Sequence, residues 1–304
     1  MERTLVNISD ELAETVRAAE PHIVSIRARR HYPSSGILWR SGAIVTADHG
    51  IHREDDITVM LAGGKTVAAA LAGRDPRTDL AVLKLQTPDP AAESLKHAGA
   101  VKVGELALVI GRSPDSGVNA SLGIVSASSG PWRTWRGGQL DAYIRLDAKL
   151  FPQSTGGAVV NARGELIGVA TSALSRIAGL AIPTSTVKSV TEKLLQKGLV
   201  PRGYLGIGAQ AVPFSEELQK KLAIPNSSGL ILLAVEPGGP ADQAGILLGD
   251  IVTAIDDTLI ENIDDLQAYS DSGVVGKSVK IKYVRGGALK ESALTVQERP
   301  GKRS

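Results

Sequence analysis

The sequence contains no cysteine. Disulfides, thiolate nucleophiles and zinc sites built on cysteine are therefore excluded. No run of about eighteen apolar residues occurs, so no membrane-spanning helix is expected. Residues 1–20 also lack the continuous apolar segment of a signal peptide. As it stands the sequence predicts a cytoplasmic protein, or a protein of the periplasm or cell envelope if a leader has been removed.

Charge of one sign is not in excess either. The chain carries 34 Lys and Arg against 32 Asp and Glu, a formal net charge of +2. This balance gives no compositional case for a nucleic-acid partner or an anionic membrane surface.

Aromatic residues are scarce, at 3%, whereas glycine is abundant, with 33 residues. This composition favours tight turns and cores built from Val, Ile, Leu and Ala. The length of 304 residues predicts about two domains.

The N-terminal segment, residues 1–20, is expected to be helical. Apolar residues share one face over 9–19, and Ser9 or Asp10 is a candidate N-cap. Pro21 is expected to end this helix.

Residues 21–196 form the first predicted domain, and most of it consists of short apolar strands separated by Gly, Asp, Pro and Asn turns. This spacing indicates an antiparallel barrel or sandwich. Residues 63–65 and 161–165 are predicted hairpin turns. The predicted strands are IVSIRA, AIVTA, DITVML, AVLKL, LALVIG, GIVSAS, AYIRLD, AVVNA, ELIGVATS and GLAIP.

A second helix is predicted over 184–196, with Thr184 or Ser185 as its N-cap. A glycine- and proline-bearing linker follows at 197–202. Residues 203–299 mix strands with two short helices and form the second predicted domain.

Three segments of the first domain carry candidate chemistry. A strand ends in His49 (IVTADHG), Asp79 opens another strand (GRDPRTDLAVLKL), and Thr155 lies in FPQSTGGA. Acyl transfer needs a hydroxyl nucleophile, a neighbouring base and a carboxylate that orients the base. It also needs backbone N–H donors for the oxyanion, which a glycine-rich turn supplies. The order histidine, aspartate, hydroxyl is that of chymotrypsin-like enzymes.

These segments, together with GGAVVNARGELIGVATSA and AIPTSTV, resemble the HtrA (Do-like, DegP) family of serine proteases. The resemblance implies a chymotrypsin-like double antiparallel β-barrel followed by a PDZ domain, and a mainly β fold. It implies that His49 is the general base, Asp79 its orienter and Thr155 the residue at the nucleophile position. The N–H groups of Gln153 and Thr155 would form the oxyanion hole.

The nucleophile loop departs twice from the family pattern of glycine, any residue, serine, glycine, glycine. Gln153 stands at the first glycine and Thr155 at the serine. The added methyl group of threonine restricts χ1, and glutamine lacks the backbone freedom of glycine. Three alternatives stay open: proteolysis is lost, is slow through Thr155, or uses Ser154 in a rebuilt loop.

Other polar residues of this domain have simpler interpretations. His52 and His49 together lack a third ligand of diagnostic spacing, so no metal site is predicted. Asp75 is expected to cap a turn with Pro76. A basic run is expected to be the solvated face of a strand: Arg27, Arg29 and Arg30.

The second domain resembles a PDZ domain of the HtrA type, on the segments RGYLGI (202–207) and EPGGPADQAGILLGDIVTAID (236–256). A PDZ domain binds a peptide C-terminus as an added strand and holds its carboxylate on backbone N–H groups. The resemblance assigns those groups to Leu205, Gly206 and Ile207. The helix that faces the peptide is expected at 264–272.

The resemblance implies a peptidase of protein quality control that acts on unfolded chains or exposed C-termini and needs no cofactor or metal. Its first specificity pocket would be bordered by 149–152 and 170–172. The resemblance implies a trimer formed through the N-terminal region of the protease domain, but residues 1–31 here contain no Phe, Trp or Tyr, which puts that mode of packing in doubt. The competing interpretation is a non-catalytic scaffold that binds peptides through the PDZ domain and the old substrate groove.

Overall fold

The computed structural model describes residues 2–29, 32–40, 42–87, 94–200, 202–271 and 273–298. Arg30 and Ser272 therefore lie outside the described residues, as does the predicted end of the second domain at residue 299. The chain divides into two compact units, Met1–Val200 and Pro201–Ser304. The finer limits drawn from the sequence at 20, 196 and 202 stay predictions.

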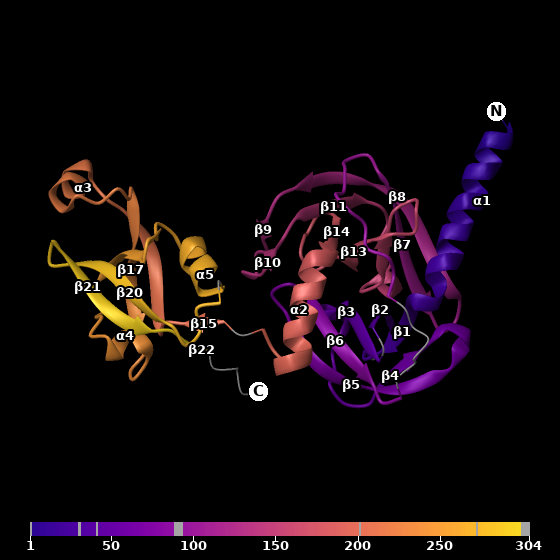
Figure 1. The fold of residues 1–304 in the computed structure, drawn as a ribbon, viewed down its shortest axis with the longest axis horizontal. Helices are drawn as coiled ribbons and strands as arrows, with labels where there is room; N and C mark the ends of the chain where they lie inside the picture. The colour runs from indigo at the N-terminus through magenta and orange to yellow at the C-terminus, as the bar shows by residue number, and fades with distance from the viewer. Residues whose placement is uncertain are drawn as a thin grey trace. The chain divides into compact units, whose positions relative to one another are not determined.

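The first unit contains two closed six-stranded antiparallel barrels (Figure 1). The barrel alternative is thus confirmed over the sandwich. The first barrel comprises β1 (Ile23–Arg27), β2 (Ser34–Arg40), β3 (Ala43–Ala47), β4 (Ile57–Met60), β5 (Thr66–Asp75) and β6 (Leu80–Leu85). The second comprises β7 (Leu106–Ser113), β8 (Gly117–Ser129), β11 (Tyr143–Asp147), β12 (Ala158–Val160), β13 (Leu166–Thr171) and β14 (Gly179–Pro183). A separate pair is formed by β9 (Trp132–Arg133) and β10 (Gln139–Leu140).

Apolar side chains fill each barrel and also join the two. One cluster lies within the first barrel and another within the second. A third cluster combines Ile23 and Val45 of the first barrel with Ile110 and Val169 of the second. Burial of this shared apolar surface stabilises the contact between the barrels, and the candidate site lies at that contact.

Helix α1 (Glu2–Ala19) lies in the N-terminal segment expected to be helical, but Ser9 and Asp10 are within the helix and do not cap it. No proline or glycine interrupts residues 2–19, and the apolar spacing of Leu12 and Val16 continues backward to Leu5 and Ile8. Leu12 and Val16 pack against the shared core, whereas Leu5 and Ile8 are exposed. The helix gives way to the 3-10 helix η1 (Glu20–His22) at Pro21, as expected.

Helix α2 (Thr184–Lys197) buries Val187, Val190 and Leu194 in the shared core. The predicted side-chain cap is wrong, because Pro183 occupies the N-cap position and no side chain caps the helix. Gly198 ends it with φ of 72°, a left-handed conformation that glycine adopts without strain.

The second unit has its own core and five main strands in the order β16, β17, β18, β20 and β21. Its described residues form three helices instead of the two predicted. The additional one, α3, is capped by Ser215, whose hydroxyl accepts a hydrogen bond from the Leu218 N–H at 3.2 Å. The elements are β15 (Gly203–Tyr204), β16 (Ile207–Pro213), α3 (Glu216–Leu222), β17 (Ser228–Val235), α4 (Pro240–Gln243), β18 (Ile251–Ile255), β19 (Thr258–Leu259), α5 (Ile263–Asp271), β20 (Ser278–Arg285), β21 (Ala288–Thr295) and β22 (Gln297–Glu298).

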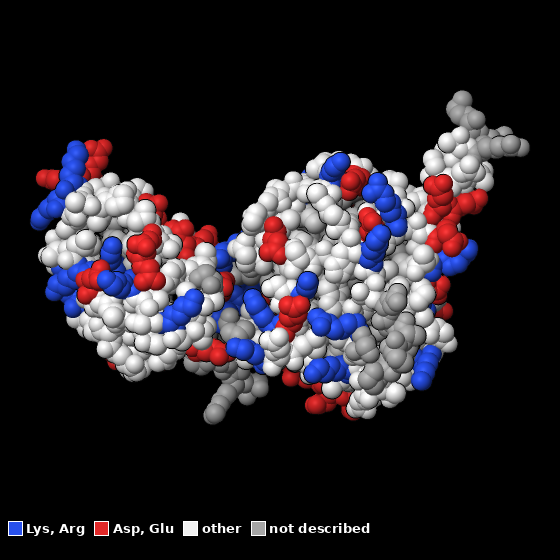
Figure 2. Space-filling view, viewed as in Figure 1, with Lys and Arg blue, Asp and Glu red and all other residues white. Residues whose placement is uncertain are grey.

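Figure 2 shows basic and acidic side chains interspersed over the visible face of both units. Among the helices that the structure describes, none combines the length and hydropathy needed to cross a bilayer.

Candidate active site

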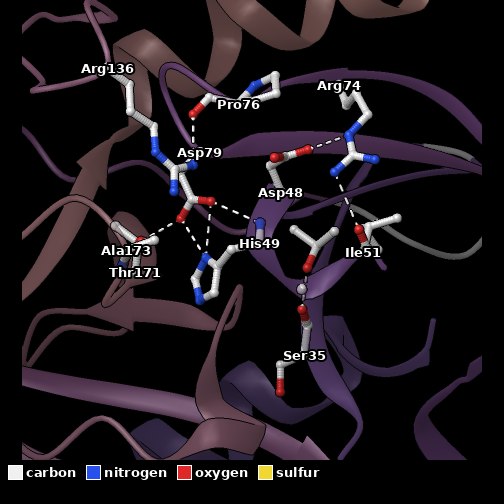
Figure 3. Close-up of polar contacts among 12 residues, drawn as sticks. Ser35, Asp48, His49, Ile51, Arg74, Pro76, Asp79, Arg136, Thr171 and Ala173 are labelled. Carbon is white, nitrogen blue, oxygen red and sulfur yellow. Dashed lines mark hydrogen bonds and ion pairs between the residues drawn. The ribbon is translucent and has the colours of Figure 1, made fainter. Parts of the chain in front are cut away.

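His49 lies at the end of β3, in the 3-10 helix η2 (Asp48–Gly50). Its ring Nδ1 lies 2.8 Å and 2.9 Å from the two carboxylate oxygens of Asp79, and its backbone N–H donates to Asp79 Oδ1 at 2.9 Å (Figure 3). Asp79 is fully buried. This arrangement orients the imidazole and leaves Nε2 available as a base.

The position of Asp79 depends on a turn that also explains Asp75. Thr78 donates to the Asp75 carboxylate at 2.7 Å, in keeping with the turn role expected for Asp75. Asp79 itself has φ of 57°, a left-handed conformation that aspartate tolerates better than most residues. The Asp48 N–H donates to the Asp79 carbonyl at 3.1 Å, so the turn and η2 are held together.

Thr171 completes the set of donors around Asp79 and was not singled out for this role from the sequence. Its hydroxyl donates to Asp79 Oδ2 at 2.5 Å, and Thr171 is fully buried at the end of β13 (Figure 3). The Asp79 carboxylate therefore contacts both barrels, the first through His49 and the second through Thr171. Only its place in the strand ELIGVATS could have indicated Thr171 in advance.

A partly buried ion pair lies next to His49. Arg74 Nε donates to Asp48 Oδ1 at 2.6 Å, and Arg74 Nη2 donates to the Ile51 carbonyl at 3.2 Å. Burial raises the pKa of the Asp48 carboxyl, and the hydrogen bond from Arg74 offsets part of that rise. The pair fixes both ends of η2, and thus the backbone that carries His49.

Arg29, from the predicted basic run, belongs to the surroundings of this site rather than to a fully solvated face. Its Nε donates to the Gly50 carbonyl at 3.2 Å. Burial lowers the pKa of the Arg29 guanidinium, and the negative charge of Asp79 opposes that shift. Arg27, by contrast, is the exposed residue of β1.

The nucleophile loop places Thr155 and Ser154 in different environments. Thr155 is buried, with 3% of its surface exposed. Ser154 is also buried, and its hydroxyl donates to Asn119 Oδ1 at 3.1 Å. Ser154 is thus engaged with β8 of its own barrel rather than with His49. Among the described residues no hydrogen bond joins Thr155 Oγ1 to His49, and such contacts often tighten only when substrate is bound.

Both glycines after Thr155 are required by close packing. A Cβ on Gly156 would lie 2.3 Å from Thr46 Oγ1, and one on Gly157 would lie 2.2 Å from the Ile110 carbonyl oxygen. Gly156 also has φ of 77°. The loop can therefore accept neither side chain without moving the strands beneath it.

Gln153, which carries one of the predicted oxyanion donors, lies in the 3-10 turn η4 (Pro152–Ser154), and Thr155, which carries the other, directly follows it. The Ser154 N–H donates to the Phe151 carbonyl at 2.9 Å. A type II turn over the same residues would need positive φ at residue 153. Among the described residues other than glycine, φ is positive at Asp56, Asp79, Ala223 and Asp256 only, so Gln153 is not in that conformation. The peptide that carries the Gln153 N–H has the orientation of a 3-10 turn, opposite to that of a type II turn.

Of the two segments expected to border the first specificity pocket, 149–152 leads into this turn, whereas in 170–172 the Ala170 carbonyl accepts from the Gly156 N–H at 2.9 Å. Phe151 is partly exposed, and the Lys149 ammonium lies 4.7 Å from the centre of its ring. Thr171, which belongs to the second segment, directs its hydroxyl to Asp79. These contacts show where the side chains of Lys149, Phe151 and Thr171 lie. That the two segments border a specificity pocket stays a prediction.

In the second unit, the three residues predicted to bind a peptide carboxylate directly follow β15 and lead into β16. Gly206 has φ of 73° and its carbonyl accepts from the Glu236 N–H at 2.8 Å, while the Leu205 carbonyl accepts from the Ala241 N–H at 3.0 Å. Ile207 begins β16, an edge strand of the sheet, and α5 lies beside it. An edge strand next to a helix provides room for an added strand.

Comparison with known proteins agrees with both halves of this description. Residues 34–169 match the trypsin-like peptidase domain, and residues 203–296 match the PDZ domain. The chain is thus a chymotrypsin-like peptidase domain joined to one PDZ domain.

Comparison with curated relatives identifies the family. Over 274 residues the chain is 31% identical to a probable periplasmic serine endoprotease DegP-like of Brucella suis, covering 88% of this chain and 52% of that protein. It is 31% identical over 267 residues to the periplasmic serine endoprotease DegP of Escherichia coli, covering 84% of this chain and 55% of the relative. The chain therefore belongs with the DegP and HtrA serine proteases and spans about half the length of these curated relatives.

Solved structures give the same result. The serine endoprotease from Yersinia pestis superposes with a TM-score of 0.76 at 28% identity, covering 95% of this chain and 98% of that one. The HtrA-type protease AlgW with a decapeptide gives a TM-score of 0.77 at 26% identity, covering 95% and 99% of the two chains.

Proposed function

We propose that this protein is an HtrA-like serine-type endopeptidase of protein quality control whose proteolysis is impaired at the nucleophile loop. The single observation that supports it best is the His49–Asp79 pair, with Nδ1 2.8 Å from a buried carboxylate. In this proposal His49 is the general base, Asp79 orients it and Thr155 attacks the scissile carbonyl. The N–H groups of Gln153 and Thr155 would bind the oxyanion.

Two features of the loop support impairment. The methyl group of Thr155 restricts its χ1, and an off-rotamer adjustment costs about 0.5–1.5 kcal/mol, which corresponds to as much as about tenfold in rate. Gln153 favours the 3-10 turn over the turn that needs positive φ. Misdirection of one oxyanion donor costs roughly 10²–10³-fold in kcat. The second effect is thus expected to dominate.

The test is turnover of casein and of a peptide library by the wild type, Thr155→Ser, Gln153→Gly and the double variant. We expect Thr155→Ser to raise kcat by about tenfold and Gln153→Gly by about 10²-fold. His49→Ala in the double variant should abolish the gain. If Thr155→Ser and the double variant turn over no faster than the wild type, impairment at these two positions is wrong.

Ser154 provides a control for the alternative nucleophile. Its hydroxyl is bound to Asn119 in a buried position, so Ser154→Ala is expected to leave turnover by Thr155→Ser unchanged. Loss of turnover in that variant would favour a rebuilt loop with Ser154 as the nucleophile.

A second candidate function is a non-catalytic scaffold that binds peptides through the PDZ domain and the old substrate groove. It is favoured by one observation, that the described residues contain no hydrogen bond between Thr155 Oγ1 and His49. A fluorophosphonate probe separates the two functions, because it labels only an activated hydroxyl. Labelling of Thr155 supports the peptidase, and no labelling even of Thr155→Ser supports the scaffold. If only the PDZ domain acts, His49→Ala changes no activity at all.

For the second unit we propose recognition of C-terminal peptides with apolar last residues, held by the N–H groups of Leu205, Gly206 and Ile207. The solved relative AlgW is described with a bound decapeptide, which supports a peptide ligand. Fluorescence anisotropy of a labelled peptide ending in an apolar residue tests this, with the C-terminal amide of the same peptide as the control.

Two further features are proposals of the same kind. Relatives named periplasmic support a location in the cell envelope, which cell fractionation tests. Light scattering tests whether the protein forms a trimer, and a molar mass equal to that of the monomer would contradict this proposal.

A further inference from the structure

Two neighbouring serines of β2, Ser34 and Ser35, are both fully buried but differ in their contacts. Successive side chains of a strand point to opposite faces. The Ser35 hydroxyl lies 2.5 Å from the Gln153 carbonyl oxygen. The Ser34 hydroxyl has no hydrogen-bond partner among the described residues. Only Ser35 therefore contacts η4 (Pro152–Ser154), the turn next to the proposed oxyanion donors, or oxyanion turn.

The direction of the Ser35 hydrogen bond is fixed by its other neighbours. A hydroxyl has one proton to donate and can accept at its lone pairs. Ser35 Oγ accepts from the Arg112 N–H at 2.8 Å, and the Arg112 carbonyl is 3.5 Å away. The proton of Ser35 therefore goes to the Gln153 carbonyl, which is 1.0 Å closer than the alternative acceptor.

Arg112 is itself held in place. Its guanidinium is buried and donates to the Ile23 carbonyl at 2.6 Å and to Glu20 at 3.1 Å. These contacts tie β7 to the start of η1 and the start of β1. The donor that orients Ser35 is thus fixed by the framework of both barrels.

The peptide unit between Gln153 and Ser154 is therefore held at both ends. Its carbonyl accepts from Ser35, and its N–H donates to the Phe151 carbonyl at 2.9 Å. This unit lies between the two N–H groups that the proposed function assigns to the oxyanion hole, on Gln153 and Thr155. Rotation of the unit would turn both neighbouring N–H groups.

We infer that Ser35 is a positioning residue for the oxyanion turn, acting through the Gln153 carbonyl. The inference rests on the proposed function for its catalytic consequence. The hydrogen bond itself can be tested without any activity.

The structural test uses NMR. Gln153–Ser154 is the single Gln–Ser step in the chain, so protein labelled with ¹³C-carbonyl glutamine and ¹⁵N-serine gives one HNCO signal. Loss of a hydrogen bond moves a carbonyl ¹³C signal upfield. We expect Ser35→Ala to move the Gln153 signal upfield and Ser34→Ala, the matched control, to leave it in place. An unmoved signal in Ser35→Ala, or equal shifts in both variants, overturns the inference. If Ser35→Ala does not fold, Ser35→Cys keeps the side-chain size with a weaker donor and is measured in the same way.

The catalytic arm uses the double variant Gln153→Gly/Thr155→Ser, in which the proposed function expects both oxyanion donors to be restored. There Ser35→Ala should lower kcat by about 10²-fold with little change in KM, because the oxyanion is bound only in the transition state. Ser34→Ala should leave kcat unchanged. A shifted signal with unchanged kcat would overturn the positioning role. If the double variant shows no turnover, the proposed function fails, and the NMR result alone decides whether Ser35 holds the turn.

Discussion

The contact between Thr171 and Asp79 allows a sharp prediction, because the same unit contains a matched control. Thr171 and Thr191 are both fully buried. Thr171 Oγ1 donates to the buried Asp79 carboxylate at 2.5 Å, whereas Thr191 Oγ1 has no partner among the described residues. Replacement by valine removes the hydroxyl from each and nearly preserves its shape.

The two replacements are expected to change the free energy of unfolding in opposite directions. A hydrogen bond to a charged group contributes about 1.5–3 kcal/mol, and its loss leaves the Asp79 carboxylate with only the two donors of His49. Thr171→Val should therefore lower the free energy of unfolding by about 1.5–3 kcal/mol. For a unit of this size that is a fall in Tm of about 3–12 °C. Thr191→Val removes an unpaired buried hydroxyl and should raise the free energy of unfolding by about 1 kcal/mol.

The assay is thermal and urea unfolding followed by tryptophan fluorescence. All three tryptophans, Trp39, Trp132 and Trp135, belong to the first unit, so the signal reports that unit alone. Equal losses in Thr171→Val and Thr191→Val would refute the reasoning, because they would show that the acceptor of the hydroxyl does not matter.

Three further predictions concern other contacts. Gly156→Ala should lower the free energy of unfolding by more than about 1 kcal/mol, since its Cβ would lie 2.3 Å from a threonine oxygen; urea unfolding checks this, and an unchanged midpoint contradicts it. In the same assay, Asp48→Asn should lower the free energy of unfolding by about 1–3 kcal/mol, because it weakens the charged hydrogen bond to Arg74. A free energy of unfolding equal to that of the wild type would show that the pair does not hold η2. Hydrogen bonds from the Lys280 backbone N–H and the Tyr269 hydroxyl lower the pKa of Asp256. The ionised Asp256 carboxylate therefore stabilises the second unit at pH values above the ordinary pKa of aspartate. This stabilisation is lost as the pH falls through the lower pKa of the folded state. NMR-detected unfolding at pH 7 and about pH 3 should show a smaller acid loss in Asp256→Asn, and an equal loss would contradict this.

The sequence predicted the double barrel and the three chain segments of the site because their signals are local. Alternating apolar strands and the segments around His49, Asp79 and Thr155 can be recognised without any distant contact. The strands Ser34–Arg40 and Thr66–Asp75 were missed. The first contains two serines and a glycine and the second is rich in alanine, residues that favour strands weakly.

What the sequence left out are contacts between distant segments. Thr171 reaches Asp79 across 92 residues, and Ser35 reaches Gln153 across 118. No local pattern distinguishes Ser35 from Ser34, although their surroundings in the fold are different. Ser154 is similar: its hydroxyl is adequate for attack, and only the contact with Asn119 shows that it is engaged elsewhere.

The carboxylate of Asp79 receives donors from both barrels, His49 from the first and Thr171 from the second. Neither barrel alone contains a complete environment for it. The proposed triad is therefore complete only while the two barrels are in contact. A motion that separates the barrels would remove part of the environment of Asp79, and with it the orientation of His49, before the chain unfolds. Activity at this site would then report whether the two barrels are correctly packed.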